Sequence, residues 1–498
     1  MSTVLSEVVT ALLAEHADRT AVADTHGRLS YRDLDQAAAE FTAAFESWWP
    51  APADAAGPRG DERPRVVISS ANSTRYVAAY LGLLRTGAVP FLLDPALGAA
   101  EVSAVVESCG IDAVVHDRPL PVQFGEPAGL PTEGLTITRT TPEAGWPQRP
   151  ELLDTTEVCR FTSGSTGTPS CIEFAGTAVR NAAQSWHDAT GVTGQDRILC
   201  FAGLFNGLAF NTSLLTSFLA GAALWLPSGL PTSGQVIRFL REVGPTRLTG
   251  FPALYESIVR RAEPIPELRE LKVALSSAAP LKPETAETLQ SVHGLAVCNY
   301  YGIAETGPLT FDPSPAPDRG QGRPLPGVEF AFAEPAQDAD SGEILVRSTS
   351  MGSRYLNAPG AFEARLNGEG FYATGDLGLL RDGNLHLTGR VSGRLNLAGR
   401  KIDAAEVRAA LLAAGATEAV VFAAEKRNGD PMLAAVASGP AGLTEEALRG
   451  YCRERFAAYK VPERIAIVDA IPTTGVGKPR LEAARELFRQ ATESALTS

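Results

Sequence analysis

The sequence predicts an α/β protein with doubly wound sheets in a large N-terminal domain, a small β-rich unit and a mobile α+β C-terminal domain. Apolar segments at 65–70, 88–95 and 112–117 alternate with helical patterns near 74–86 and 98–109. Strands separated by helices of this length are typical of parallel sheets that are covered by helices on both faces. We therefore expect a doubly wound core in the N-terminal part of the chain.

Two segments interrupt this alternation. Residues 119–153 are rich in Pro, Gly and Thr and lack a periodic apolar pattern, so we expect a connecting segment or a covering loop there. A second cluster of turn residues, SPAPDRGQGRPLPG at 314–327, precedes the strand-like strings EFAFAE and GEILVRS. These strings predict the smaller β-rich unit, and Asp-Gly-Asn at 382–384 predicts a hairpin turn within it.

Length and charge exclude several classes of protein. A chain of 498 residues, of which 44% are hydrophobic and 20% charged, is long enough for two or more globular domains. Its net charge of -13 disfavours nucleic acid and anionic membranes as partners. The longest apolar stretch, around 214–226, is shorter than the ~20 residues of a membrane span, and the N-terminal segment resembles an amphipathic helix more than a signal peptide. We expect a cytoplasmic protein, and the sequence does not indicate its oligomeric state.

The six cysteines are scattered along the chain without a C-x-x-C pair. Metal sites of the zinc type and disulfide frameworks both need closer or paired spacings. We therefore expect six buried thiols in a reducing compartment.

The string RFTSGSTGTPS, from Arg160 to Ser170, holds six small hydroxyl residues and two glycines after a short apolar strand. Such a loop can turn several backbone N–H groups and hydroxyls toward one point, as a polyphosphate requires. It differs from the common nucleotide-triphosphate loop because no lysine follows Gly164 or Gly167. From the residues alone, phosphate binding and a solvated loop both remain open.

The string TSGSTGTP at 162–169 resembles the phosphate loop of the adenylate-forming superfamily, which contains acyl-CoA synthetases, nonribosomal-peptide adenylation domains and beetle luciferases. Ten further motifs agree with the superfamily in the same order along nearly the whole chain. They are LSYRDLD at 29–35, TGAVPFLLDP at 86–95, SSAAPL at 276–281, NYYGIAETG at 299–307, GRPLPGVE at 322–329, GEILVRS at 342–348, YATGDLG at 372–378, GR at 389–390, LAGRKIDAAEV at 397–407 and PTTGVGKPR at 472–480.

This resemblance implies a two-step reaction. A carboxylate attacks the α-phosphate of ATP to give an acyl-adenylate and pyrophosphate, and a thiol or amine then displaces AMP. It also implies an N-terminal domain at 1–390 and a mobile C-terminal domain at 391–498, which rotates between the two steps about a hinge at Ser392. CoA is the default acceptor because the full C-terminal domain is retained and no carrier domain is fused.

The resemblance also implies residues that hold ATP and magnesium (Mg2+). Glu305 takes the position that binds magnesium, and Lys478 takes that of the catalytic lysine, which neutralises charge between the substrate carboxylate and the α-phosphate. Asp376 is the ribose ligand and Arg390 adds a ribose or phosphate contact. Asn299 is expected to read the adenine amino group, and Tyr301 with Ala278 and Ala279 forms the adenine slot. The remaining nucleotide-binding positions are Thr162, Ser163, Gly164, Ser165, Thr166, Gly167, Tyr300, Gly302 and Ala304.

The predicted acid pocket is apolar and aromatic, which favours a bulky hydrophobic or aryl carboxylic acid. The stretch FAGLFNGLAFN at 201–211 lacks the aspartate with which amino-acid-activating domains hold an α-amino group, and Asn206 stands where many acyl-CoA synthetases have histidine. Apolar pockets discriminate poorly by size, so the identity of the acid stays open. The predicted pocket residues are Phe201, Phe205, Asn206, Gly207, Gly250, Phe251 and Ser277.

Two residues depart from the superfamily pattern. Ser170 replaces the lysine that ends the phosphate loop, and Ala304 replaces the threonine that binds the α-phosphate. Three alternatives to an acid–CoA ligase therefore remain: an acyl-AMP ligase that delivers to a carrier-protein thiol or an amine, a half-reaction enzyme that transfers a preformed acyl-adenylate to CoA, and a non-catalytic nucleotide-binding scaffold.

Overall fold

The chain divides into two compact units. Unit 1 comprises residues 1–330, 346–372 and 382–385, and unit 2 comprises residues 331–345, 373–381 and 386–498. The computed structural model describes residues 12–13, 15–49, 63–120, 122, 124–125, 127–129, 134–142, 146, 148–162, 169–227, 232–261, 263–276, 281–314, 320–333, 341–391, 394–397, 400–426, 431–456, 458–473 and 480–494. Each unit is described by itself. The boundary at residue 390, expected from the superfamily resemblance, stays a prediction.

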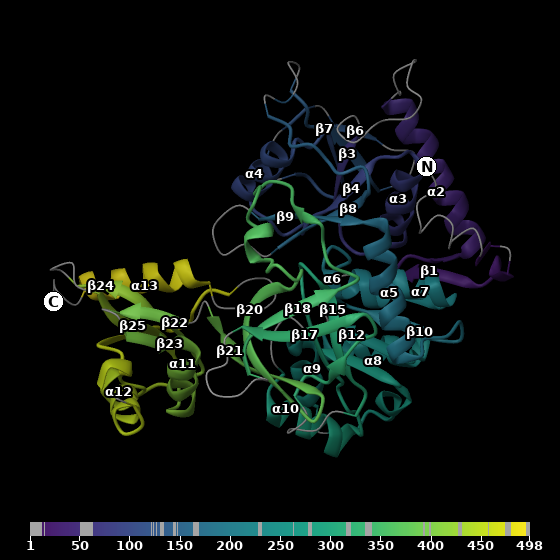
Figure 1. Ribbon diagram of the computed structural model, residues 1–498. Coiled ribbons are helices and arrows are strands. Elements are labelled where there is room, and N and C mark those ends of the chain that lie inside the picture. Colours follow the sequence, from purple (N-terminus) through teal and green to yellow (C-terminus); the bar gives the residue numbers. More distant parts are fainter. Residues whose placement is uncertain are drawn as a thin grey trace. The chain divides into compact units, whose positions relative to one another are not determined.

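An eight-stranded sheet forms one layer of unit 1, in the order β19-β9-β8-β4-β3-β5-β7-β6. Figure 1 labels six of its strands, β3, β4, β6, β7, β8 and β9. Its central strands β3, β4, β5 and β8 are parallel, and each flanking strand is antiparallel to the neighbour on its inner side. This parallel core confirms the predicted α/β fold. The strands are β3 (Arg65–Ser69), β4 (Val89–Leu92), β5 (Ala113–His116), β6 (Pro127–Gly129), β7 (Thr136–Arg139), β8 (Thr156–Phe161), β9 (Cys171–Ala175) and β19 (Arg354–Tyr355).

A second sheet of six strands has the order β13-β12-β10-β11-β1-β2. Strands β13, β12, β10, β11 and β1 are parallel, and β2 is antiparallel to β1. The strands are β1 (Thr20–Asp24), β2 (Arg28–Ser30), β10 (Arg197–Cys200), β11 (Ala223–Leu226), β12 (Arg247–Gly250) and β13 (Val273–Ser276).

The helices of unit 1 bury their apolar faces against these sheets. Val102, Val105 and Val106 of α4 pack with Val67 and Phe91 of the eight-stranded sheet, as the predicted β-α-β alternation requires. The helices are α2 (Tyr31–Trp48), α3 (Thr74–Arg85), α4 (Ala99–Cys109), α5 (Gly176–Thr190), α6 (Gly207–Ala209), the π-helix η2 (Phe210–Leu215), α7 (Thr216–Ala220), α8 (Ser233–Val243), α9 (Pro252–Val259), η3 (Pro266–Glu270), α10 (Pro283–Thr288), η4 (Leu289–His293) and η5 (Glu363–Arg365).

The strands expected after residue 327 are present, because β17, β18, β20 and β21 form a four-stranded sheet in that order. Just before them in the chain, β14, β15 and β16 form a three-stranded sheet. Asp382 and Gly383 have φ angles of 52° and 77°, so the predicted hairpin turn at 382–384 is confirmed. The strands are β14 (Asn299–Ile303), β15 (Gly307–Asp312), β16 (Arg323–Pro324), β17 (Val328–Ala333), β18 (Ser341–Ser348), β20 (Tyr372–Arg381) and β21 (Asn384–Arg390).

The C-terminal part of unit 2 has its own hydrophobic core. Val407 and Leu411 of α11 pack with Ala435 of β25 and Leu448 of α12. The mixture of strands and helices matches the α+β domain that the sequence predicts. The elements are β22 (Arg394–Leu397), β23 (Arg400–Asp403), α11 (Ala404–Ala413), β24 (Glu418–Glu425), β25 (Pro431–Ser438), α12 (Glu445–Arg453), η7 (Ala458–Lys460), β26 (Arg464–Ile467) and α13 (Leu481–Ser494).

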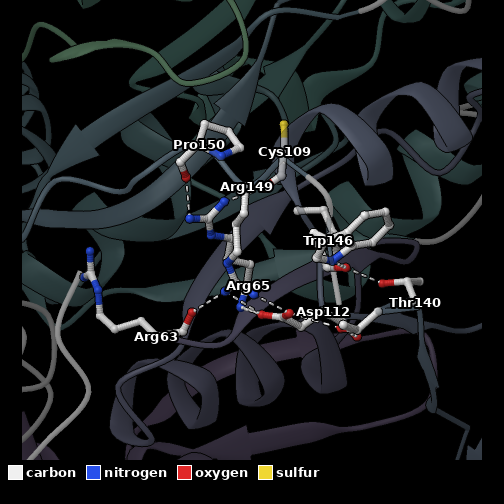
Figure 2. A network of polar contacts seen from close by, with 10 residues as sticks. Arg63, Arg65, Cys109, Asp112, Thr140, Trp146, Arg149 and Pro150 are labelled. Carbon is white, nitrogen blue, oxygen red and sulfur yellow. Dashed lines mark hydrogen bonds and ion pairs between the residues drawn. The ribbon is translucent and has the colours of Figure 1, made fainter. Parts of the chain in front are cut away.

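The segment at 119–153 is more than a connecting segment, which corrects the sequence-based prediction. It contains β6 and β7, and β7 pairs antiparallel with β5 at the side of the eight-stranded sheet. The following residues are fixed by the polar network in Figure 2, in which Arg149 donates two hydrogen bonds of 2.7 and 2.9 Å to Asp112. Trp146 Nε1 donates to the carbonyl of Ile111 (3.1 Å). Bidentate pairing of a buried carboxylate offsets the cost of burying its charge.

All six cysteines are buried and carry free thiols, as predicted. Among the helices in the described ranges, none combines the length and apolar composition that crossing a bilayer requires.

Candidate functional site

Strand β8 leads directly into the predicted phosphate loop. The N–H of Thr162 donates a 3.0 Å hydrogen bond to the carbonyl of Ser170, so the chain enters and leaves the loop at the same point. The predicted ligands Ser163, Gly164, Ser165, Thr166 and Gly167 lie outside the described residues. Their roles stay predictions.

Asn357 fixes the end of this loop, and sequence reasoning missed it. Its Oδ1 accepts from the N–H of Cys171 (2.8 Å), and its Nδ2 donates to the carbonyl of Pro169 (3.0 Å). A single asparagine of this kind gives no sequence signal, because its partners are 186 and 188 residues away. It holds the backbone where the loop rejoins the sheet.

The hairpin of β14 and β15 presents Glu305 in its connecting turn. The N–H of Thr306 donates to the carbonyl of Ile303 (3.3 Å), which closes the turn. Gly307 follows with a φ of +75°, and a Cβ there would lie 3.2 Å from Ser350 Oγ. The left-handed conformation therefore explains the glycine at this position.

Two tyrosines position the Glu305 carboxylate. The Tyr355 hydroxyl donates a 2.7 Å hydrogen bond to Glu305 Oε1, and the Tyr372 hydroxyl lies 3.0 Å from that of Tyr355. Burial, the charge of Glu305 and this hydrogen bond all raise the pKa of Tyr355, so its hydroxyl keeps its proton. Tyr355 was not predicted from the sequence, whereas Tyr372 is the first residue of the YATGDLG motif.

The donor set around Glu305 fits a magnesium ion that is bound mainly by a nucleotide. Oε1 is held by Tyr355, which leaves Oε2 for a cation. The described residues include no group of three or more His, Cys, Asp or Glu side chains that could hold a metal by themselves. Magnesium usually takes one or two carboxylates together with substrate phosphates and water, so one carboxylate oxygen suffices.

The predicted adenine-binding residues are described in part. Tyr301 is buried, with 7% of its surface exposed, and the adjacent Tyr300 packs edge-on against Trp186 with ring centroids 5.7 Å apart. Asn299 Nδ2 donates to the carbonyl of Gly320 (2.5 Å), which leaves Oδ1 as the acceptor that an adenine amino group needs. Ala278, Ala279 and the pocket residue Ser277 lie outside the described residues.

Asp376 belongs to unit 2. It is a buried residue of β20, and its N–H donates to Thr374 Oγ1 (3.0 Å). Arg390 is the last residue of β21, while Ser392 and Lys478 lie outside the described residues. The ribose, hinge and lysine assignments therefore stay predictions.

The predicted acid pocket begins at a helix with a wide central turn. Asn206 caps this helix, because its Oδ1 accepts from the N–H of Leu208 (2.9 Å). Helix α6, the π-helix η2 and α7 follow without a break, and π-turns occur frequently at functional sites. Asn72, which was not predicted from the sequence, fixes the preceding loop. Its Nδ2 donates to the carbonyl of Ala202 (2.7 Å), and its Oδ1 accepts from the N–H of Leu204 (2.8 Å).

The other predicted pocket residues lie on neighbouring elements of unit 1. The N–H of Phe201 donates to the carbonyl of Thr249 (2.9 Å), and Gly250 ends the strand that contains Thr249. Phe251 is the N-cap residue of α9. A Cβ on Gly203 would lie 2.2 Å from the Phe205 ring, so the glycine makes room for that ring.

Comparison with known proteins decides the family. The pattern of the AMP-binding enzyme family matches residues 9–356, and that of the AMP-binding enzyme C-terminal domain matches residues 409–478. The chain belongs to the AMP-binding enzyme family. This confirms the predicted membership of the adenylate-forming superfamily.

Relatives in this family align over most of the chain. The 3-[(3aS,4S,7aS)-7a-methyl-1,5-dioxo-octahydro-1H-inden-4-yl]propanoyl:CoA ligase of Rhodococcus jostii is 28% identical, over 95% of this chain and 96% of its own length. The salicyl-AMP ligase / salicyl-S-ArCP synthetase of Mycobacterium tuberculosis is 29% identical, over 93% of this chain and 86% of its own. The O-succinylbenzoate coenzyme A synthetase of Bacillus subtilis, solved with AMP, shares the fold with a TM-score of 0.78, 21% identity and coverage of 95% and 97%.

Proposed function

We propose that this protein is an AMP-forming acid–thiol ligase, which activates a carboxylic acid with ATP and transfers the acyl group to CoA. The observation that carries the proposal is the hydrogen bond between Tyr355 and Glu305. Tyr355 lies on β19, which pairs with β9, and β9 follows the predicted phosphate loop. The hydrogen bond thus connects Glu305, the predicted magnesium ligand, to the sheet next to β9, the strand that follows the predicted phosphate loop.

In the first step, the loop residues 162–167 hold the phosphates of ATP, Glu305 supplies a carboxylate oxygen to magnesium, and Asp376 with Arg390 holds the ribose. When bound, magnesium shields the phosphate charge from the incoming carboxylate. Lys478 neutralises the charge that accumulates as the carboxylate attacks the α-phosphate. The acid becomes an acyl-adenylate, and pyrophosphate leaves.

In the second step, rotation about Ser392 replaces the lysine loop with another face of the C-terminal domain, and a thiol displaces AMP. CoA is the proposed acceptor because relatives that align over most of the chain are named as CoA ligases. The relative from M. tuberculosis carries a name with a different acceptor, ArCP. A carrier-protein thiol is therefore the second candidate acceptor.

Pyrophosphate exchange tests the first step. Labelled pyrophosphate should enter ATP only when a suitable acid is present, and a panel of aryl, polycyclic and aliphatic acids should identify that acid. CoA or a carrier protein is then added to identify the acceptor. If no acid in the panel supports exchange, the proposed adenylation is wrong, and transfer from a synthetic acyl-adenylate would then separate a half-reaction enzyme from a scaffold.

A further inference from the structure

Arg160, the last residue but one of β8, carries a buried guanidinium group for which the described residues supply no hydrogen-bond acceptor. Only 4% of the residue is exposed. Its Nε has no hydrogen-bond partner, and no hydrogen bond or ion pair joins the guanidinium to any residue that the structure describes. The carboxylate of Glu305 stabilises this charge electrostatically, but it accepts no hydrogen bond from the guanidinium. Buried N–H donors that lack an acceptor cost free energy, so they indicate a place for a ligand.

Aromatic rings surround this cation. The guanidinium carbon lies 4.0 Å from the centroid of Phe174 and 5.4 Å from that of Phe210. These contacts stabilise the cation, but an aromatic face accepts none of the N–H groups that point outward in the plane of the guanidinium. Burial lowers the pKa of Arg160 to about 10, which still leaves it protonated at neutral pH.

Other buried arginines of unit 1 have acceptors. Arg65 donates to the carbonyls of Cys109 and Pro150 at 2.6 and 2.5 Å (Figure 2). Arg247 donates to the carbonyl of Thr190 (2.9 Å) and lies 3.4 Å from the carboxylate of Asp196. The Nε atoms of Arg65 and Arg247 are also without a hydrogen bond, but each of these two guanidinium groups bonds at least one acceptor, whereas that of Arg160 bonds none among the described residues.

The unpaired donors lie at the predicted acid pocket. A Cβ on Gly207 would lie 2.4 Å from Arg160 Nη1 and 3.9 Å from Asn211 Nδ2. Asn211 Nδ2 is also buried and has no hydrogen-bond partner among the described residues. Gly207 follows Asn206, and both are predicted to line the pocket. Two donors, one of them charged, thus converge beside Gly207, and the described residues supply no acceptor for them.

We infer that Arg160 binds a second carboxylate of the acid substrate, with Asn211 as an additional donor, so that the protein selects dicarboxylic acids. This inference rests on the proposed function and refines its substrate class: the pocket is aromatic but contains one buried cation. A guanidinium group matches a carboxylate in geometry and charge, and the missing side chain at Gly207 leaves room for the guanidinium group at this place.

The test compares matched pairs of acids in the pyrophosphate-exchange assay: benzoate with isophthalate and terephthalate, and hexanoate with adipate. The parent protein should favour at least one dicarboxylic acid over its monocarboxylic partner by about tenfold to a hundredfold in kcat/KM, the range expected for a charge-assisted hydrogen bond. Arg160→Met should bring this ratio close to one, mainly through the KM for the dicarboxylic acid. Arg160→Lys should retain part of the preference.

Arg65→Met is the matched control, because it removes a buried arginine that already has acceptors. It should lower the melting temperature without changing the ratio. The inference is wrong if the parent prefers no dicarboxylic acid, or if Arg160→Met lowers the activation of both members of each pair equally. An equal loss would indicate that Arg160 acts on the reacting carboxylate or on folding.

A binding measurement separates this inference from the proposed reaction. Calorimetric titration with benzoate, isophthalate, terephthalate, hexanoate and adipate measures binding without turnover. The parent protein should bind at least one dicarboxylic acid more tightly than the matching monocarboxylic acid, and Arg160→Met should bind the two equally. Gly207→Ala, whose Cβ would displace Nη1, should weaken the same preference. Selective binding without pyrophosphate exchange would contradict the proposed function and support the inference, whereas binding without selectivity would overturn the inference.

Discussion

The hydroxyl of Tyr355 donates a 2.7 Å hydrogen bond to Oε1 of Glu305, although the two residues are 50 positions apart. Tyr355 belongs to β19, which pairs with β9 at Tyr355↔Ile172, two residues after Ser170. The N–H of Gly352 also donates to the carbonyl of Glu305 (2.8 Å). The segment at 352–355 therefore connects the Glu305 turn to the strand that follows the phosphate loop.

Tyr355→Phe should weaken the response to magnesium. Removing a hydrogen bond to a charged group costs about 1.5–3 kcal/mol, so we expect the magnesium concentration that gives half-maximal pyrophosphate exchange to rise by about tenfold to a hundredfold. Initial rates at varied free magnesium measure this change. Tyr372→Phe keeps the bond between Tyr355 and Glu305 and serves as the control. An equal effect of both variants would contradict a positioning role for Tyr355.

Lys478→Ala should abolish adenylation and leave the fold intact, because the lysine is proposed to act on charge in the transition state. Pyrophosphate exchange should fall by about a hundredfold or more, the scale expected when one charge-stabilising donor is removed. Transfer from a synthetic acyl-adenylate to CoA should fall much less. Lys282→Ala, which removes a largely exposed lysine 3.5 Å from Glu256, is the control. Exchange within a few-fold of the parent rate would remove Lys478 from the mechanism.

Ser170→Lys should lower the KM for ATP several-fold. A lysine near the β- and γ-phosphates adds about 1 kcal/mol of attraction at an effective dielectric constant near 20. The backbone bond from Thr162 to the Ser170 carbonyl does not involve the side chain and should persist. Steady-state kinetics at fixed free magnesium measure the change. An unchanged KM would mean that the loop satisfies the phosphates without this charge.

Asp196→Asn should destabilise the protein at neutral pH. Burial raises the pKa of Asp196, but hydrogen bonds from Thr246 and the backbone of Thr193, together with Lys272 and Arg247, lower it to about 2. The pKa in the folded protein lies below the unfolded value of 3.8. The ionised carboxylate therefore adds about 2 kcal/mol to the free energy of unfolding above pH 4, and this contribution is lost as the pH falls toward 2.

Melting temperatures measured from pH 7 down to pH 3 test this prediction. The difference in melting temperature between the parent and Asp196→Asn should stay constant above pH 4 and become smaller below it. Asp188→Asn removes an exposed carboxylate beside His187 and should change little at any pH. A gap that is independent of pH down to the acid limit would mean that packing, and not charge, stabilises this site.

The fold could be predicted from the sequence because alternating strands and helices leave a periodic pattern that is local in the chain. Strands β6 and β7 were missed because they contain three and four residues and lie among prolines and glycines. Their pairing with β5 is a long-range property, which no local pattern encodes. The polar network that fixes the following segment to Asp112 is equally invisible in the sequence.

The site could be predicted only where a residue belongs to a motif. Glu305 was found through NYYGIAETG, whereas Tyr355, Asn357 and Asn72 are single polar residues whose function depends on distant partners. Arg160 stands in the loop string itself, but its proposed role rests on burial without an acceptor among the described residues, which appears only in three dimensions.

The π-helix at Phe210–Leu215 makes the pocket segment sensitive to insertions and deletions in the gene. A π-turn holds one residue more than an α-turn, and one residue of an α-helix corresponds to about 100° of rotation. Loss of a single codon within this stretch would restore α-helical pairing and turn Gly207 relative to Thr216–Ala220, so the acid profile in pyrophosphate exchange should change. Length variation here is therefore a short evolutionary route to a new substrate, in a helix that could otherwise diversify only by replacing one side chain at a time.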